Sequence, residues 1–375
     1  LGILYFLVSR LIACRIKFVP AVATVLGILT LIYLNIGVHS IPSSLFLTAM
    51  IAITWWNRRE FDRIGYTYAW EDRVKDLSGI GATLIATLVF LARMDSHHLG
   101  SLYHMKKFVS HWLGLLIMAL IIVLVYRVIL RFMRNSGTAF GSEFNKERYE
   151  NFLATIDNKN LDASLAFLGD KYLYWYQEDG EDRAVFQFAM ENNKCVVMSD
   201  PLSQRGYLDK AISKFLGDAE LENISVVFYE VNQETTLVLH DYGYDFMKFG
   251  EMAHVPLDTF TLEGKSGRRF RTAVNKLDIK GYKFEVLQPP FDDTLMATLR
   301  HISDSWLDGR QEKGFSLGYF DEEYIKLAPI AIARDENDEI LAFVTFMVEN
   351  SKEISGIDLM RYDLDKSPNG IMDYL

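Results

Sequence analysis

The chain has few cysteines. Only Cys14 and Cys195 occur in 375 residues, and the first lies in an apolar run. Two distant thiols provide neither a disulfide framework nor the spacing of a metal site, so nothing argues for an oxidising compartment and we expect no metal. The first residues, LGILYFLVSR, lack an initiator methionine, a basic leader and a cleavage site, so we do not expect a signal peptide. Because the chain also stops just after a turn at 367–370, we expect it to be a piece of a longer protein.

Charge is scarce before about residue 133, where long hydrophobic runs dominate, and the acidic residues that make the net charge -10 lie mostly in the rest of the chain. A membrane span needs about 20 mostly apolar residues. Residues 1–134 therefore predict a transmembrane region, followed by a polar linker at 135–147. The predicted spans are 18–38, 41–56, 77–94 and 111–132, with a partial span at 1–13.

Short basic loops orient these spans. Basic residues follow the partial span and the second full span, and they also close the last one. The positive-inside rule places all three basic sets in the cytoplasm. We therefore predict a multi-pass protein whose chain after about residue 135 is cytoplasmic. The three sets are Arg10, Arg15 and Lys17; Arg58, Arg59 and Arg63; and Arg127, Arg131 and Arg134.

After the linker the pattern becomes mixed α/β. Runs rich in β-branched and aromatic residues alternate with amphipathic helical runs in two similar rounds. We predict two related lobes, at 148–262 and, incomplete, at 263–375. The predicted helices are 207–221, 235–244, 265–277 and 292–309. The predicted strands are 171–177, 183–190, 194–201, 224–231, 245–257, 283–289 and 353–363, with a hairpin at 330–350.

One segment, 265–283, is basic within an acidic surrounding. It carries a single acid, Asp278. Such a segment is a candidate binding site for the phosphates of RNA or of an anionic lipid. A solvated charged face is the alternative. The cations are Lys265, Arg268, Arg269, Arg271, Lys276, Lys280 and Lys283.

Four stretches carry a family resemblance. They are GEMAHVPLDTF (250–260), ISDSWL (302–307), EKGFSLGYFDEEY (312–324) and GIDLMR (356–361). Over most of 145–375 the chain resembles the synthase domain of the bacterial phosphatidylglycerol lysyltransferases, also called lysylphosphatidylglycerol synthetases or multiple peptide resistance factors. The run at 304–324 is far more specific than a short motif.

The resemblance implies a tandem acetyltransferase-like (GNAT-like) fold. It implies transfer of an aminoacyl group, usually lysyl, from aminoacyl-tRNA to the glycerol hydroxyl of phosphatidylglycerol at the cytoplasmic face of the bacterial plasma membrane. The cationic product would weaken attraction of cationic antimicrobial peptides. Since the donor is already an activated ester, exchange of one ester for another requires neither ATP nor a cofactor. The identity of the amino acid and self-association as a homo-oligomer stay open.

The motif GIDLMR contains Asp358 and Arg361, which the resemblance implies as catalytic residues of the aminoacyl-binding site. A carboxylate suits a substrate ammonium, and the planar guanidinium suits a phosphate or an ester carbonyl. A structural ion pair is the alternative. An ideal strand points positions i and i+3 to opposite faces, so the two can share a pocket only if the strand ends or bulges between them.

Further candidates lie in the specific run. Asp304, on a predicted helix, is a candidate base for the lipid hydroxyl, with an ordinary surface acid as the alternative. Glu312, Lys313 and Ser316 belong to a glycine-bearing loop that would line the acceptor site. The stretch 361–372 lacks the RxxGxG pattern of a pyrophosphate loop and carries aspartates, which argues against acetyl-coenzyme A.

Other functions stay open as well. A peptidoglycan-bridge aminoacyltransferase also uses tandem lobes and aminoacyl-tRNA, but it would not need membrane spans. A non-catalytic lipid-binding part of a flippase would fit the basic segment but not the specific stretch at 312–320. Because the second lobe is incomplete, an inactive piece of an active enzyme is the third alternative.

Overall fold

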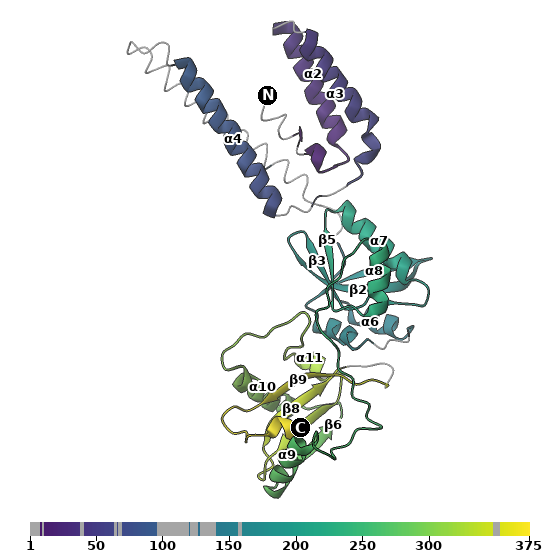
Figure 1. Ribbon diagram of the computed structural model, residues 1–375, viewed down its shortest axis with the longest axis vertical. Coiled ribbons are helices and arrows are strands. Elements are labelled where there is room, and N and C mark those ends of the chain that lie inside the picture. Colours follow the sequence, from purple (N-terminus) through teal and green to yellow (C-terminus); the bar gives the residue numbers. More distant parts are fainter. Residues whose placement is uncertain are drawn as a thin grey trace. The chain divides into compact units, whose positions relative to one another are not determined.

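The computed structural model describes residues 8–9, 11–37, 41–63, 66, 70–95, 120, 127, 140–156, 160–347 and 353–375 (Figure 1). The chain forms two compact units. Unit one comprises 1–140 together with 190–195 and 216–226, and unit two comprises 141–189, 196–215 and 227–375.

Three long helices dominate the described part of unit one. They are α2 (Val19–Gly37), α3 (Ile41–Trp56) and α4 (Trp70–Asp95), and the short 3-10 helix η1 (Arg58–Glu60) follows α3. Helices α2 and α3 pack against each other, and the indole nitrogen of Trp55 donates a hydrogen bond of 2.6 Å to the hydroxyl of Thr24.

The segments predicted as membrane spans at 18–38, 41–56 and 77–94 are helical, whereas 111–132 lies outside the described residues apart from Leu120 and Arg127. Over the part of the chain that the structure describes, no helix combines the length and the apolar character that a membrane crossing requires. Helix α3 has only 16 residues, and α4 begins with the charged stretch WEDRVKD. The predicted multi-pass arrangement therefore finds no support in these residues.

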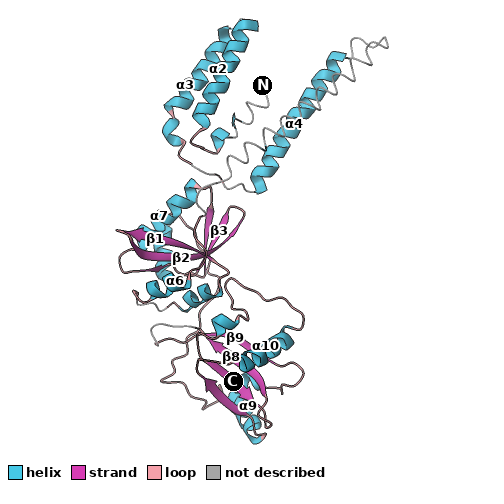
Figure 2. Ribbon diagram, turned by 180° about the vertical axis from the view of Figure 1, so that it is seen from behind, coloured by secondary structure: helices cyan, strands magenta, loops and turns pink. Residues whose placement is uncertain are grey.

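The first sheet has the strand order β1-β2-β3-β5, and β4 pairs with β2. Its strands are β1 (Tyr172–Glu178), β2 (Glu181–Glu191), β3 (Lys194–Met198), β4 (Leu202–Ser203) and β5 (Ser225–Tyr229). The β1–β2 turn residues, Asp179 and Gly180, have φ of 56° and 80°, as a tight hairpin turn that follows the strand twist requires. The accompanying helices are α6 (Lys146–Leu153), η2 (Leu161–Leu168), α7 (Leu208–Leu221) and α8 (Gln233–Asp241) (Figure 2).

The second sheet is antiparallel with the order β6-β7-β8-β9. Its strands are β6 (Lys283–Leu287), β7 (Ile330–Arg334), β8 (Ile340–Phe346) and β9 (Ile357–Tyr362). Its helices are α9 (Arg268–Ile279), α10 (Asp293–Leu307), α11 (Glu322–Ile325) and α12 (Ile371–Tyr374). The β7–β8 pairing confirms the predicted hairpin.

Side-chain alternation gives this sheet two covered faces. On one face, Ile332 and Phe343 lie opposite each other and pack with α10. On the other face, Ala333 and Ala342 pack with Leu277 of α9 and with α12. Because neighbouring residues of a strand point to opposite faces, α9 and α10 lie on different sides of the sheet.

A shared core within unit two contains residues of both sheets. We call the first sheet with α6, η2, α7 and α8 the first lobe, and the second sheet with α9, α10, α11 and α12 the second lobe. Leu165 and Met198 of the first lobe belong to the same buried cluster as Leu299, Tyr324 and Phe343 of the second. Any polar group in this contact is therefore surrounded by apolar side chains from both lobes.

The predicted strand at 245–257 is wrong. The segment has no regular secondary structure, although its composition is that of a strand. A strand needs a neighbour for its backbone N–H and C=O groups, and the described sheets offer this segment no pairing. Several large apolar side chains of the segment are therefore exposed: Phe246, Met247, Phe249, Met252, Val255 and Leu257.

Candidate functional site

A bulge in β9 shapes the candidate site. In the β8–β9 pairing, Thr345 lies opposite two residues, Asp358 and Leu359. The backbone N–H of Leu359 donates a hydrogen bond of 3.0 Å to the Thr345 hydroxyl. A bulge re-aims a side chain, so Asp358 and Arg361 both reach the loop at 312–320 although they are three positions apart.

Arg361 is held by its own neighbours. Its two terminal nitrogens each donate to one carboxylate oxygen of Glu312, both at 2.7 Å, and one of them also donates to the hydroxyl of Ser303. The guanidinium carbon lies 5.2 Å from the centre of the Trp306 ring, within cation–π range. The residue is only 3% exposed. Paired oxygens that match the guanidinium fork make this a specific ion pair, in which the arginine is buried and the carboxylate is partly exposed.

The ion pair with Arg361 also shifts the pKa of Glu312. Burial by itself would raise the pKa of the Glu312 carboxyl. The hydrogen bonds from Arg361 and from the backbone N–H of Phe320 outweigh burial, so the pKa is lowered. Glu312 is therefore an ionised carboxylate at neutral pH, and it anchors the start of the loop at 312–320.

Asp358 has fewer partners. Its Oδ1 accepts a hydrogen bond of 3.0 Å from the backbone N–H of Gly318. Burial raises the pKa of the Asp358 carboxyl, and the Tyr324 hydroxyl, the Gly318 N–H, Arg361 and Lys171 oppose the rise. Among the described residues its Oδ2 is buried without a hydrogen bond of ordinary geometry, although the hydroxyl of Tyr324 is near enough to affect its pKa.

Gly318 leaves room for this carboxylate. A Cβ atom at this position would lie 1.9 Å from Asp358 Oδ2, far closer than two non-bonded atoms can approach. The backbone of the loop therefore lies directly on the carboxylate. No other residue type fits here unless Asp358 moves.

The first lobe holds the same loop from its other side. The backbone N–H of Phe315 donates to Asp170 Oδ2 at 3.0 Å, and the Tyr319 hydroxyl donates to the carbonyl of Leu168 at 2.8 Å. The loop at 312–320 is thus fixed by β9 on one side and by the end of η2 on the other. Its geometry depends on contact between the lobes.

A buried lysine lies next to this contact. The ammonium of Lys171, with 0% of its side chain exposed, pairs with Asp170 at 2.6 Å and donates to the carbonyl of Leu165 at 3.1 Å. Burial lowers the pKa of Lys171, and Asp170 and Asp358 oppose this. The site therefore contains a cation that sequence reasoning did not select.

The structure does not bring the basic segment to this site. Most of its cations lie on α9 and the preceding turn, Lys280 and Lys283 follow α9, and α9 packs on the sheet face opposite α10. Arg269 pairs with Asp373 at 2.6 Å, and Arg271 donates to the carbonyls of Leu262 and Gly264. Lys265 and Arg268 are exposed. The second sheet thus separates this segment from Asp358.

The other residues predicted for the site differ in how close they lie to Asp358 and Arg361. Glu312 meets Arg361, whereas Asp304 is exposed on α10 and Lys313 is exposed in the loop. Ser316 is half-buried in the same loop. Sequence reasoning missed several polar residues of the site: Ser164, Asp170, Lys171 and Tyr324. Tyr324 ends the specific run at 304–324, which was a usable signal, but the three first-lobe residues carry none.

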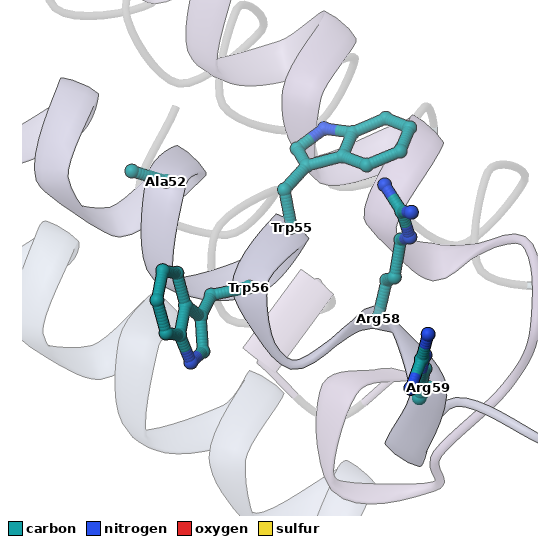
Figure 3. Close-up of a pocket in the computed structure, with 5 residues that line it drawn as sticks. All are labelled: Ala52, Trp55, Trp56, Arg58 and Arg59. Carbon is teal, nitrogen blue, oxygen red and sulfur yellow. The ribbon is translucent and has the colours of Figure 1, made fainter.

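A separate hollow lies in unit one, at the end of α3 (Figure 3). Its volume is about 510 Å³, and it is lined by Ala52, Trp55, Trp56, Arg58 and Arg59. The Arg58 guanidinium lies 5.7 Å from the Trp55 ring. These residues provide no nucleophile and no carboxylate. Within the described ranges, no group of three histidine, cysteine or acidic side chains is arranged to hold a metal ion.

Comparisons with known proteins agree on one family. Residues 150–375 match the family model described as "Phosphatidylglycerol lysyltransferase, C-terminal". A phosphatidylglycerol lysyltransferase of Bacillus subtilis is 39% identical over 267 residues, which is 71% of this chain and 31% of that protein. One of Staphylococcus aureus is 32% identical over 258 residues, which is 67% of this chain and 29% of that protein.

A solved structure is similar as well. L-PGS from Bacillus licheniformis is 41% identical, with a TM-score of 0.59, and the match covers 63% of this chain and 74% of that one. Its likeness supports a mixed α/β domain in the second part of the chain. The chain spans about a third of the length of the curated relatives it matches.

Proposed function

The chain belongs to the phosphatidylglycerol lysyltransferase family, and on that premise we propose that it transfers an aminoacyl group, most often lysyl, from aminoacyl-tRNA to phosphatidylglycerol. The observation that carries the proposal is the pair of Asp358 and Arg361 on one bulged strand. Both contact the loop at 312–320, which lies in the family's most specific run. A half-buried carboxylate that faces the contact between two lobes is suited to a cationic substrate.

The reaction exchanges one ester for another. The glycerol hydroxyl oxygen of the lipid attacks the carbonyl carbon of the aminoacyl ester, and the bond from that carbon to the ribose oxygen of the tRNA breaks. The hydroxyl proton ends on the ribose oxygen, so no further reactant is consumed. Positioning of two large substrates can supply much of the acceleration, because the bimolecular step becomes effectively unimolecular.

Asp358 binds an ammonium group of the aminoacyl substrate in this proposal. Its raised pKa reflects a buried carboxylate with few partners, and a substrate cation would compensate the buried charge. Arg361 acts as a positioning residue, because Glu312 and Ser303 already engage its terminal nitrogens. It holds the loop that donates the Gly318 N–H to Asp358.

The wider arrangement is part of the same proposal. The lobes at 148–262 and 263–375 form a tandem acetyltransferase-like fold, and the reaction occurs at the cytoplasmic face of the bacterial membrane, where charged tRNA is found. The cations of the basic segment bind phosphates of the substrates away from Asp358. The lysylated lipid is cationic and weakens attraction of cationic peptides to the membrane.

A transfer assay tests this function. The protein is incubated with phosphatidylglycerol vesicles and lysyl-tRNA carrying radiolabelled lysine, and label is followed into the lipid phase. Asp358→Ala is compared with Asp241→Ala, which removes an exposed carboxylate at the end of α8. We expect lipid label with the unchanged chain and with Asp241→Ala, and its loss with Asp358→Ala and with phosphatidylcholine vesicles.

Two other results would point elsewhere. Label in a soluble peptidoglycan precursor, with none in lipid, would indicate the bridge-type transferase. Binding of phosphatidylglycerol without transfer from any charged tRNA would indicate a lipid-binding part. Either result refutes the proposed reaction for this chain.

A further inference from the structure

The middle of the loop at 312–320 is held by a carboxylate of the first lobe. The last part of the loop is held within the second lobe, through the backbone N–H of Gly318. Earlier in the loop, the backbone N–H of Phe315 donates a hydrogen bond of 3.0 Å to Asp170 Oδ2. Within the described ranges, residues 313–317 make no other hydrogen bond. The polar anchor of this stretch therefore comes from the other lobe.

Asp170 is itself fixed in place. Its Oδ1 pairs at 2.6 Å with the ammonium of Lys171, whose side chain is 0% exposed. The same ammonium donates a hydrogen bond of 3.1 Å to the carbonyl of Leu165. A carboxylate with one oxygen bound to a buried cation has little freedom to move, so Oδ2 is a fixed acceptor for the loop.

The loop has a costly backbone conformation at the residue that Asp170 holds. Phe315 has a φ of 67°, which is unfavourable for a bulky side chain and persists only where neighbouring contacts impose it. The Phe315 ring lies 6.1 Å from the ring of Tyr229 in β5. A Cβ atom on Gly314 would lie 3.1 Å from Asp170 Oδ2, so the backbone passes close to the carboxylate. Contacts with the first lobe therefore impose this shape on the loop.

A second contact with the first lobe follows directly after Gly318. The hydroxyl of Tyr319 donates a hydrogen bond of 2.8 Å to the carbonyl of Leu168, at the end of η2. Gly318 thus lies between two anchors to the first lobe, Phe315 before it and Tyr319 after it. Its N–H donates to Asp358 Oδ1 at 3.0 Å. A shift of the backbone on either side would move this N–H away from the carboxylate.

We propose that Asp170, with the Leu168 carbonyl beside it, is a positioning residue that acts through the loop at 312–320 and keeps the Gly318 N–H on Asp358. The first lobe thereby controls the geometry of a site whose charged pair belongs to the second lobe. The inference rests on the proposed function and adds what controls its site. Loss of the anchor at Phe315 frees the middle of the loop and takes from Asp358 the N–H that orients it.

Two double variants of the full chain isolate this anchor. Asp170→Ala/Lys171→Met removes the acceptor of the Phe315 N–H, whereas Asp170→Asn/Lys171→Met keeps an acceptor oxygen there. Both variants lose the ion pair without leaving an unpaired buried charge. Hydrogen–deuterium exchange, resolved to the Gly318 amide, compares them. We expect exchange on the order of 10-fold faster in the variant with alanine, and equal exchange in α10, which reports that the fold is intact.

The transfer assay provides a second measurement. We expect kcat/KM for lysyl-tRNA to be on the order of 10-fold lower in Asp170→Ala/Lys171→Met than in Asp170→Asn/Lys171→Met. Loss of folded protein alone would lower kcat and leave KM unchanged, whereas a misplaced Asp358 also raises KM. Asp241→Ala, which removes an exposed carboxylate, should match the unchanged chain.

The outcomes separate this inference from the proposed function. Equal exchange of the Gly318 amide in the two double variants overturns the inference, and so does faster exchange with equal kcat and KM. If exchange in α10 shows that Asp170→Ala/Lys171→Met is unfolded, Tyr319→Phe replaces it, and an unchanged Gly318 amide in that variant overturns the inference. If the unchanged chain transfers no label, the proposed function is refuted, and exchange still decides whether the first lobe holds the Gly318 N–H on Asp358.

Discussion

Removal of the Arg361 guanidinium should destabilise the second lobe strongly. Arg361→Met keeps an unbranched apolar stem of similar reach, but it leaves the Glu312 carboxylate in a partly buried position without its partner. Loss of one partner of a buried ion pair costs about 3–5 kcal/mol. The Glu312 side chain keeps 30% exposure and still accepts the N–H of Phe320. We therefore expect the lower end, about 3 kcal/mol.

Urea unfolding at neutral pH measures this cost. Arg334→Met is the matched control, because Arg334 pairs with the half-exposed Glu285 at 3.4 Å. An exposed pair of this kind contributes about 0–1 kcal/mol. Addition of Glu312→Gln to Arg361→Met should recover part of the loss, since no unpaired charge remains. A cost for Arg361→Met no larger than that for Arg334→Met would refute the assignment of a structural ion pair.

The same pair predicts the direction of a pH effect. The folded-state pKa of Glu312 is lowered, so its contribution to stability is fully present above the unfolded value of about 4.3. It is lost as the pH falls through the folded pKa. In Arg361→Met this loss on acidification should be absent, because the group that lowers the pKa has been removed.

Three further predictions follow from the site. Asp358→Asn should raise the melting temperature at neutral pH, because burial raises the carboxyl pKa, and the gain should disappear below about pH 3.9. Gly318→Ala should abolish transfer and lower the melting temperature, since its Cβ would displace Asp358; unchanged transfer would contradict this. Cys195 is 0% exposed and burial raises its pKa to about 12, so mass spectrometry should find iodoacetamide labelling only after unfolding; rapid native labelling would contradict the burial.

Local periodicity predicted most elements of the second part correctly. The helix at 292–309 appears as α10, because its apolar spacing matches a single covered face. The hairpin at 330–350 appears as β7–β8, because its two short runs of β-branched and aromatic residues are typical of strands. The same reasoning failed at 245–257. A strand-like composition is a local property, whereas a strand also requires a neighbour, and neighbours are chosen by the whole fold.

The candidate site likewise combines features that the local sequence predicts with features that depend on the whole fold. The specific family stretches were enough to select Asp358, Arg361 and Glu312 as candidates. The folded structure was needed to show that a bulge at Asp358 brings Asp358 and Arg361 to one loop, and that the Glu312 carboxylate accepts hydrogen bonds from the Arg361 guanidinium. The sheet likewise separates the basic segment from the site. First-lobe residues such as Asp170 could not be selected from sequence, because their contact with the loop at 312–320 arises only when the two lobes pack together.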